Sequence, residues 1–262
     1  MKPAIVTITA YKRPYYLKQC LEAIKAADLT HIERIVVSCD AHSKDMHDRM
    51  FSVVEDAGLK NATIINLMLR RFGVANHPRV LINEIIERYP GHPIVALEED
   101  TVVSPDAFNL AWWGVQQRDY KFVNLGAGVK TEKYWGCDEF IVYDDWELRS
   151  PYAWAFHPIF WQLLEPYWNG KIRAPYGWDW QVSHLCYREG WFCLTPALSR
   201  CRNIGRDEGT YDTPENWDRD RKDELICNVS TDIISNSNYY IVNRNRPSKA
   251  DWPEWVKREM VP

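Results

Sequence analysis

Three consecutive carboxylates, Glu98-Glu99-Asp100, follow directly on the uninterrupted apolar run Ile94-Val95-Ala96-Leu97. Such a run is typical of a strand that is covered on both faces in a parallel sheet. In open α/β sheets, ligands bind beyond the carboxyl ends of the strands. Acids at that place offer hard oxygen ligands to a divalent cation such as Mn2+ or Mg2+. A solvated acidic turn is the alternative interpretation of this segment alone.

Two further acids could take part in the same chemistry. Asp40 ends another apolar run, Ile35-Val36-Val37-Ser38-Cys39, so it is expected on the same sheet edge as Asp100. Asp179 lies between two tryptophans at the start of a predicted helix. It could be a general base whose pKa is adjusted by apolar neighbours, or an ordinary helix N-cap.

A rival metal site is the pair Asp144-Asp145, which ends the apolar run Phe140-Ile141-Val142-Tyr143. Its composition suits a cation as well as the earlier acids do. It follows the point where regular alternation of strands and helices breaks down, however, and no capped helix comes after it. The sequence therefore favours Glu98-Glu99-Asp100.

Three arginines could meet phosphate groups. Arg13 lies in the turn Thr9-Ala10-Tyr11-Lys12-Arg13-Pro14, where its guanidinium could contact a phosphate, contact a base edge, or lie at the surface. Arg200 and Arg206 lie in the segment 198–210, which contains two glycines. This segment is predicted to be either a mobile loop that closes over a diphosphate or a plain surface loop.

The elements that would position these residues alternate regularly at first. Apolar residues at helical spacing follow each of the first three strands, and the links are too long for hairpins, which predicts a parallel sheet with right-handed crossovers. Strands are predicted at 3–9, 35–40, 62–67, 94–97, 121–125, 140–145, 191–195 and 238–242. Later helices are predicted at 107–118, 157–167, 178–186 and 252–260.

The chain has 262 residues and a formal net charge of -4, which suits one large or two small α/β domains and gives no electrostatic case for a nucleic-acid partner. All thirteen tryptophans fall at or after Trp112. A nucleotide-binding half followed by an acceptor-binding half would have this composition, because sugar rings stack on indole faces. The alternative is that the tryptophans pack the core of the second half.

Several classes of protein are disfavoured. There is no Gly-x-Gly-x-x-Gly motif and no P-loop, so a dinucleotide-binding or P-loop site is not expected. No apolar stretch is long enough for a transmembrane helix, and a strand begins directly after Met1, which leaves no room for a signal peptide. The seven cysteines form no Cys-x-x-Cys pair, and Cys186, Cys193 and Cys201 are predicted to be buried free thiols. We therefore expect a soluble, cytoplasmic protein.

Taken together in this order, the segments resemble the nucleotide-sugar glycosyltransferases of the GT-A fold, and among them the N-acetylglucosaminyltransferase I family. The resemblance extends from about residue 3 to 210 as a spaced series of short motifs. These are Thr9 to Pro14, Ile35 to Asp40, Asn76-His77-Pro78-Arg79, Glu98-Glu99-Asp100, Gly177-Trp178-Asp179-Trp180, and the stretch 188–206.

The resemblance implies an α/β fold with a mostly parallel, Rossmann-like sheet flanked by helices, in a single domain whose second half is irregular and rich in aromatic residues. It implies a glycosyltransferase domain over residues 1–225. Residues 1–100 would be its nucleotide-binding half and 101–225 its acceptor and catalytic half. Residues 226–262 would form a C-terminal extension packed on the domain.

The resemblance also implies an inverting transfer from a nucleoside diphosphate sugar, most simply a UDP-sugar, with Mn2+ or Mg2+ as cofactor. Asp100 would be the metal ligand, and Asp179 would be the catalytic base. The nucleotide sugar would be bound by Thr9, Arg13, Asp40, His77, Glu98, Glu99, Arg200 and Arg206.

The chain also departs from the family pattern. Glu99 stands where the family's Glu-Asp-Asp motif has Asp, which affects outer contacts more than the metal ligand itself. No membrane anchor or luminal stem like that of the Golgi members is expected, so a bacterial or phage-type cytosolic hexosyl- or pentosyltransferase fits better and the acceptor is open.

Two other functions remain open from the sequence. The chain could be a non-catalytic module that binds a nucleotide or a sugar. It could also be a phage-type enzyme that glycosylates a hydroxymethylated base in DNA, which is weakly supported by the basic residues Arg244, Arg246, Lys249, Lys257 and Arg258.

Overall fold

The strands of this computed structural model form one mixed sheet of nine strands and a separate sheet of two. The model describes residues 1–40, 42–60, 62–66, 71–127, 141–145, 147–148, 150–168, 178–209, 213–220 and 239–242. The strands are β1 (Ala4–Ala10), β2 (Ile32–Cys39), β3 (Ala62–Asn66), β4 (Ile94–Glu98), β5 (Thr101–Val103), β6 (Tyr120–Asn124), β7 (Ile141–Asp145), β8 (Ala153–Phe156), β9 (Phe192–Pro196), β10 (Cys201–Asn203) and β11 (Tyr240–Val242).

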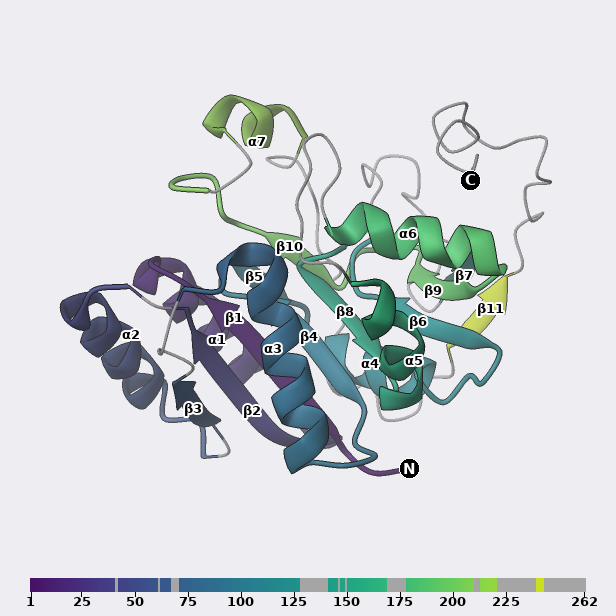
Figure 1. Ribbon diagram of the computed structural model, residues 1–262, viewed down its shortest axis with the longest axis horizontal. Coiled ribbons are helices and arrows are strands. Elements are labelled where there is room, and N and C mark those ends of the chain that lie inside the picture. Colours follow the sequence, from purple (N-terminus) through teal and green to yellow (C-terminus); the bar gives the residue numbers. More distant parts are fainter. Residues whose placement is uncertain are drawn as a thin grey trace.

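The large sheet has the strand order β11-β7-β9-β6-β8-β4-β1-β2-β3 (Figure 1). β3, β2, β1 and β4 run parallel, and β8 lies antiparallel between β4 and β6. The chain leaves β1 toward β2 on one side and later returns to pair β4 with the other edge of β1. The topological switch point, where ligands bind in open α/β sheets, therefore lies between β1 and β4.

Helices cover both faces of the sheet, and residues that alternate along the strands face one layer or the other. One core contains Val6 and Ile8 of β1 together with apolar residues of the first, second and fourth helices, whereas Ile5 belongs to the other core, with the third, fifth and sixth helices. In Figure 1, α3 lies in front of β1, β2 and β4. The helices are α1 (Pro14–Ala26), α2 (Lys44–Ala57), α3 (Gly73–Arg88), α4 (Ala107–Gly114), α5 (Pro158–Leu164), a 3-10 turn η2 (Glu165–Tyr167), α6 (Trp178–Glu189) and α7 (Pro214–Asp220).

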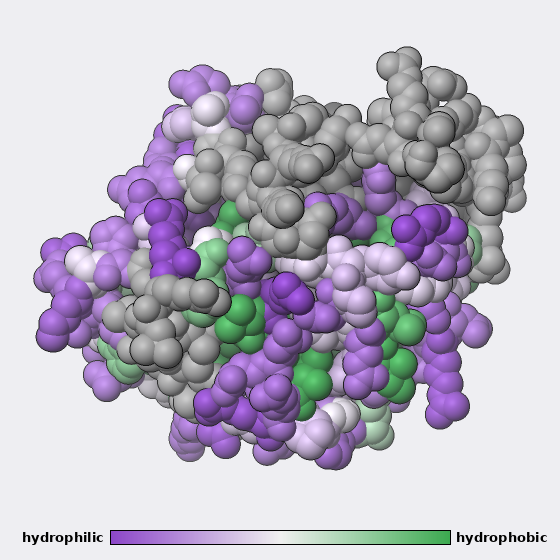
Figure 2. Space-filling model, in the orientation of Figure 1, coloured by the Kyte–Doolittle hydropathy of each residue, from purple (hydrophilic) through white to green (hydrophobic). Residues whose placement is uncertain are grey.

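The tryptophans of the second half are largely core residues. Trp154, Trp161, Trp168 and Trp178 are buried in the core beneath α3, α5 and α6, where Trp168 and Trp178 stack with ring centroids 4.8 Å apart. For these four tryptophans, core packing accounts for their place in the second half, which the sequence analysis had also linked to stacking on sugar rings. The face of the molecule seen in Figure 2 is mainly hydrophilic, with hydrophobic residues in separate small areas.

The α/β class and the parallel order of the first four strands are confirmed. The helix predicted over 107–118 ends at Gly114, and the segment 198–210, predicted as a loop, contains β10. The short strands β5 and β8 and the helix α7 were not predicted. The helix predicted over 252–260 and the basic residues of the tail lie outside the described residues.

The burial of three cysteine thiols agrees with the prediction. Cys186, Cys193 and Cys201 are buried and form no disulfide among the described residues, and the same is true of Cys20 and Cys39. Within the described segments, no helix has the length and apolarity that crossing a membrane would require.

Candidate functional site

The carboxyl ends of β1, β2 and β4 open into one cavity at the switch point of the sheet. Seven of the predicted site residues line this cavity: Thr9, Arg13, Asp40, His77, Glu98, Glu99 and Asp100. The prediction that Asp40 and Asp100 share one edge of the sheet is therefore confirmed. Residues from later segments, Tyr152, Asn203 and Gly205 among them, line the opposite wall.

The acidic cluster is held by backbone bonds on two sides. The Glu99 amide donates to the Thr9 carbonyl over 3.0 Å, which ties the turn after β4 to the end of β1. The Ile204 amide donates to the Asp100 carbonyl over 2.7 Å, and the strand after Asp100 (β5) pairs with the strand before Ile204 (β10). The cluster is thus fixed between the end of β1 and the segment that follows β10.

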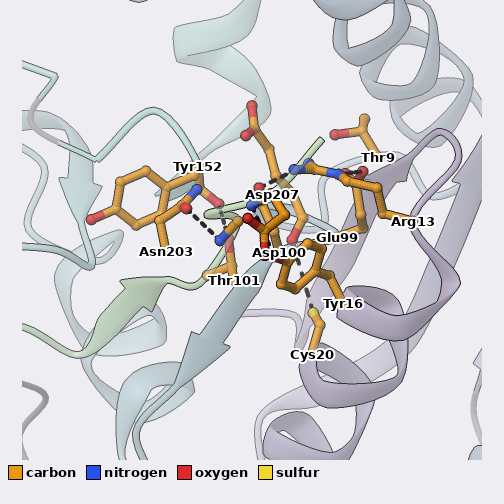
Figure 3. Close-up of polar contacts among 12 residues, drawn as sticks. Thr9, Arg13, Tyr16, Cys20, Glu99, Asp100, Thr101, Tyr152, Asn203 and Asp207 are labelled. Carbon is orange, nitrogen blue, oxygen red and sulfur yellow. Dashed lines mark hydrogen bonds and ion pairs between the residues drawn. The ribbon is translucent and has the colours of Figure 1, made fainter. Parts of the chain in front are cut away.

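Arg13 bridges the two acids at the end of this cluster (Figure 3). Its Nε lies 2.9 Å from Glu99 Oε1, and one terminal nitrogen lies 2.8 Å from Asp100 Oδ2. Burial alone would lower the pKa of Arg13, but the charges of Glu99 and Asp100 outweigh burial and raise that pKa above its ordinary value. Arg13 therefore stays a cation at every physiological pH.

Asp100 has one carboxylate oxygen that is engaged and one that is not. Oδ2 is bonded to Arg13, whereas Oδ1 is buried and has no hydrogen-bond partner in the described part of the chain. A buried carboxylate oxygen without a partner is costly, which makes Oδ1 a suitable ligand for a hard divalent cation. The same described segments contain no group of three or more His, Cys, Asp or Glu side chains placed to hold a metal. Asp100 fits a cation that takes its other ligands from water and phosphate.

The other two acids carry raised pKa values. Burial, followed by the charges of Asp100 and Glu99, raises the pKa of Glu98 to about 8, and the charge of Asp179 adds to this shift. Burial and the charge of Asp100 raise the pKa of Glu99 to about 7, against the opposing effect of Arg13. Perturbed carboxyl groups of this kind, gathered in one cavity, are typical of functional sites.

Asp179 lies in the first turn of α6, as predicted, and is partly exposed. The charge of Asp179 contributes to the raised pKa of Glu98, which indicates that Asp179 lies near the acidic cluster. It is not among the residues that line the cavity. The preceding residue, Trp178, contacts a smaller neighbouring cavity that Glu98 also lines. Glu98 thus links the main cavity to the start of α6.

Asp40 has a structural role that the sequence analysis did not predict. Its Oδ1 accepts from the Phe72 amide over 2.8 Å and its Oδ2 from the Gly73 amide over 2.7 Å, so it satisfies the N-terminus of α3. One turn further along α3, His77 Nε2 lies 2.8 Å from the hydroxyl oxygen of Ser38, and burial lowers the pKa of His77 to about 4. His77 is therefore neutral at pH 7.

The prediction that Arg200 closes over a diphosphate is corrected by its position. Arg200 is fully buried, its Nε lies 2.7 Å from Asp106 Oδ2, and it does not line the cavity. Asp106, at the start of α4, is also fully buried. A buried carboxylate without a cationic partner is strongly destabilising, which accounts for the position of Arg200 inside the protein. Arg206 also lies away from the cavity lining, where its Nε is 2.9 Å from Asp218 Oδ1.

The rival pair of acids lies elsewhere in the sheet. β7 is separated from β4 by β9, β6 and β8. Asp145 is buried and does not line the cavity, and the side chain of Asp144 lies outside the described residues. Glu98-Glu99-Asp100 is thus the acidic group that lies at the switch point.

Tyr11, Lys12 and Arg71 are among the cavity residues that the sequence analysis did not predict as site residues. The Arg71 guanidinium lies 4.7 Å from the ring centroid of Tyr11, and the Tyr11 ring meets His42 edge-on at 5.4 Å. Lys12 joins Arg71 and Arg13 as a third cation in the lining. Tyr11 and Lys12 lie in the turn after β1, and Arg71 lies two residues before α3 begins at Gly73. Their positions after a strand and before a helix could have indicated a place at this edge of the sheet.

Gly205 packs directly against the bridge between Arg13 and Asp100. A Cβ atom at this position would lie 1.9 Å from Asp100 Oδ2 and 2.9 Å from an Arg13 terminal nitrogen. Only glycine permits this approach of backbone to ion pair. The segment after β10 is therefore in contact with the acidic cluster.

No protein-family model matches the chain, and no curated protein is similar to it in sequence. Solved structures with a similar fold include a mannosyltransferase, PcManGT of Pyrobaculum calidifontis in complex with GDP-Man and Mn2+, with a TM-score of 0.53 and 16% identity over 75% of this chain and 55% of that one. S. aureus TarS (residues 1–349) has a TM-score of 0.52 and 14% identity over 74% and 58% of the two chains. GalNAc-T7 with UDP, GalNAc and Mn2+ has a TM-score of 0.60 and 13% identity over 81% and 45%.

This chain thus spans about half the length of each of these three proteins. Identities of 13–16% establish the fold alone. The narrower resemblance to the N-acetylglucosaminyltransferase I family stays a prediction. The chain has the GT-A fold, with a mostly parallel mixed sheet between two layers of helices and an acidic cavity at the carboxyl ends of its central strands.

Proposed function

We propose that this protein is a metal-dependent glycosyltransferase that moves a sugar from a nucleoside diphosphate sugar to an acceptor hydroxyl. The observation that carries the proposal is Asp100, whose buried Oδ1 lacks a partner in the described structure while its side chain lines a cavity with three cations. The cavity lies at the switch point of a fold whose similar solved structures include complexes with GDP-Man and with UDP, each with Mn2+.

The mixture of charges in the cavity suits a nucleotide sugar. Lys12, Arg13 and Arg71 can meet the negative charge of a diphosphate, and Tyr11 offers an aromatic ring beside Asp40 and His77. We propose that this side of the cavity takes the nucleoside, with a UDP-sugar as the first donor to test. Asp100 would hold Mn2+ or Mg2+, which would supply positive charge to neutralise the departing diphosphate.

The transfer is proposed to invert the anomeric carbon. The acceptor oxygen forms a bond to that carbon from the face opposite the diphosphate, the bond from carbon to the phosphate oxygen breaks, and Asp179 takes the hydroxyl proton. Support for Asp179 comes from its place in the first turn of α6, near Glu98. Arg200 is not part of this proposal, because it is buried against Asp106.

The remaining predictions are carried forward as parts of the proposal. They are a cytoplasmic enzyme of bacterial or phage type, a nucleotide-binding half over 1–100, an acceptor half over 101–225, and a C-terminal extension from 226. β11 belongs to that extension and pairs with β7 at the edge of the sheet. The acceptor stays open between a saccharide, a lipid-linked sugar and a DNA base.

The proposal is tested by a thermal-shift screen of UDP, GDP and their sugar conjugates, with and without Mn2+. A ligand at 100 times its Kd stabilises the folded state by about 2.7 kcal/mol. For a chain of this size, each kcal/mol corresponds to about 2–4 °C in Tm. We expect a shift of this order with one nucleotide, and a larger shift when Mn2+ is added.

The matched variants are Asp100→Ala and Asp145→Ala, which remove one buried carboxylate each from the two competing sites. Asp100→Ala should abolish the Mn2+-dependent part of the shift, and Asp145→Ala should retain it. The reverse pattern would assign the metal to the other strand. Release of UDP from a UDP-sugar without acceptor would separate an enzyme from a module that only binds.

A further inference from the structure

Arg13 is bonded to the same carboxylate that is proposed to bind the metal. Its side chain is 13% exposed, and the Glu99 and Asp100 side chains that it bridges are 7% and 6% exposed. Ion pairs this deeply buried are far stronger than surface pairs, because water screens them little. Any cation that approaches Asp100 therefore meets the positive charge of Arg13 in a poorly screened place.

We infer that Arg13 strengthens the mutual dependence of cation binding and nucleoside diphosphate binding, beyond the coupling that direct contact between the cation and phosphate would give. This inference rests on the proposed function and names how the same site is regulated. It assigns Arg13 a role as a positioning and coupling residue.

The charges of the cluster give the reason. A divalent cation that binds alone adds two positive charges beside Arg13. A diphosphate that binds alone brings negative charge toward the acidic cluster around Asp100, which lines the same cavity. When both bind, the cation lies with the acids and the diphosphate lies with Arg13, so that every charge has an opposite neighbour.

The surroundings of Arg13 restrict its alternatives. The Tyr16 ring centroid lies 5.4 Å from the guanidinium carbon, and the Gly205 backbone closes the side toward the segment after β10. Asp100 Oδ2 is bonded to Arg13, and Oδ1 is left for another partner. A cation and Arg13 must therefore share the carboxylate of Asp100 or compete for it.

Arg71 provides a matched control in the same cavity. It is also a cation, but its guanidinium lies over the Tyr11 ring, in the part of the cavity next to Gly73 and Asp40. Arg71→Gln should weaken nucleotide binding by the same factor with and without metal. Arg13→Gln should instead weaken nucleotide binding by different factors with and without metal.

The experiment measures the affinity of Mn2+ alone, by the electron paramagnetic resonance signal of free Mn2+, in the presence and absence of saturating UDP or GDP. In the wild-type protein, the nucleotide should tighten Mn2+ binding at least about tenfold, within the usual range of coupling between two ligands. In Arg13→Gln, Mn2+ alone should bind about threefold or more tighter, and the tightening by nucleotide should be about threefold or more smaller than in the wild-type protein. Arg13→Lys, which keeps the charge, should restore the wild-type coupling.

Two results would overturn the inference. Weaker binding of Mn2+ alone to Arg13→Gln would show that Arg13 only orients Asp100, and an unchanged coupling factor would show that Arg13 does not link the ligands. If Arg13→Gln does not fold, Arg13→Met gives a second test, because it also removes the positive charge and keeps an unbranched side chain. The same two changes are expected of it, and weaker binding of Mn2+ alone or an unchanged coupling factor would contradict the inference. A wild-type protein that binds neither Mn2+ nor nucleotide would instead refute the proposed function.

Discussion

Single residues of the acidic cluster divide the proposed chemistry among themselves. Asp100 offers a free oxygen, Arg13 holds the other oxygen of the same carboxylate, and Glu98 connects the cavity to Asp179. The sequence predicts each of these residues from its place after a strand or at a helix start. Their contacts could not be predicted, because the partners of Arg13 lie 86 and 87 positions away and become neighbours only in the folded sheet.

Asp179→Asn tests the proposed base. General-base catalysis contributes on the order of 10²–10⁴-fold, so turnover should fall by that order while the thermal shift with nucleotide and Mn2+ stays. Glu189→Gln removes an exposed carboxylate from the other end of α6 and should leave both quantities unchanged. Near wild-type rates in Asp179→Asn would remove Asp179 from the mechanism.

Glu98→Gln tests the raised pKa of Glu98 through stability. Burial and the charges of Asp100 and Glu99 raise this pKa from 4.5 to about 8. Between these values the folded protein keeps a proton that the unfolded chain has lost, so stability falls as pH rises through this window. Without metal or nucleotide, Glu98→Gln should therefore gain stability over wild type from pH 5 to 8.5, by on the order of 1 kcal/mol. Urea unfolding across this range measures the gain.

The control for this pH experiment is Glu22→Gln, which removes an exposed carboxyl of α1. Its difference from wild type should stay constant from pH 5 to 8.5. A constant difference for Glu98→Gln as well would mean that Glu98 ionises in the folded protein as an ordinary glutamate does.

At the scale of elements, Asp40 joins the N-terminus of α3 to the side of the cavity that is proposed to bind the nucleotide. Asp40→Ala removes two bonds to backbone amides and should lower stability by about 1–2 kcal/mol. Ser43→Ala removes the cap of α2, where the serine oxygen accepts from the Met46 amide over 3.3 Å. Both variants should lower Tm, but only Asp40→Ala should also lose the shift with nucleotide. Equal nucleotide shifts in the two variants would reduce Asp40 to a helix cap.

Long, continuous elements could be predicted from the sequence, and short ones could not. β4 is an apolar run with an abrupt acidic end, and α1 shows buried residues at helical spacing, so both have strong local signals. β5 and β10 have three residues each, which is too short for any periodic pattern. β8 consists of four buried residues without alternation, because it lies inside the sheet with both faces covered.

The burial of Arg200 could not be predicted from the sequence either. Its neighbours in sequence suggest a basic surface segment, and only the contact with Asp106, 94 positions earlier, accounts for its position. Periodicity reports which face of an element is apolar, but it carries no information about a polar partner far along the chain.

At the scale of the whole molecule, a buried network connects distant parts of the chain. Asp106 at the start of α4 accepts hydrogen bonds from Arg200 over 2.7 Å, from the Tyr239 hydroxyl over 2.9 Å and from Ser104 over 2.7 Å. Tyr239 directly precedes β11, so the network fastens the last described strand to the body of the sheet.

Variants of this network should change stability and leave the site intact. Tyr239→Phe should cost about 0.5–1.5 kcal/mol, and Arg200→Met about 3–5 kcal/mol, because the second leaves Asp106 buried without its cation. Urea unfolding measures both losses. The Mn2+-dependent shift with nucleotide should persist in each variant at a temperature where it is folded. Loss of that shift in a folded Arg200→Met protein would indicate that Arg200 does take part in donor binding.

The pairing of β5 with β10 has a further consequence for how the proposed enzyme could diversify. The carboxylate that is proposed to hold the cation and the loop that carries Gly205 lie at the same end of one small antiparallel ladder, and the Ile204 amide binds the Asp100 carbonyl. A change of loop sequence upstream of Gly205 would disturb the cation ligand as well as the outer wall of the cavity. In the proposed enzyme, new acceptor preferences would therefore be acquired more easily by substitutions beyond Gly205, which lie outside the ladder.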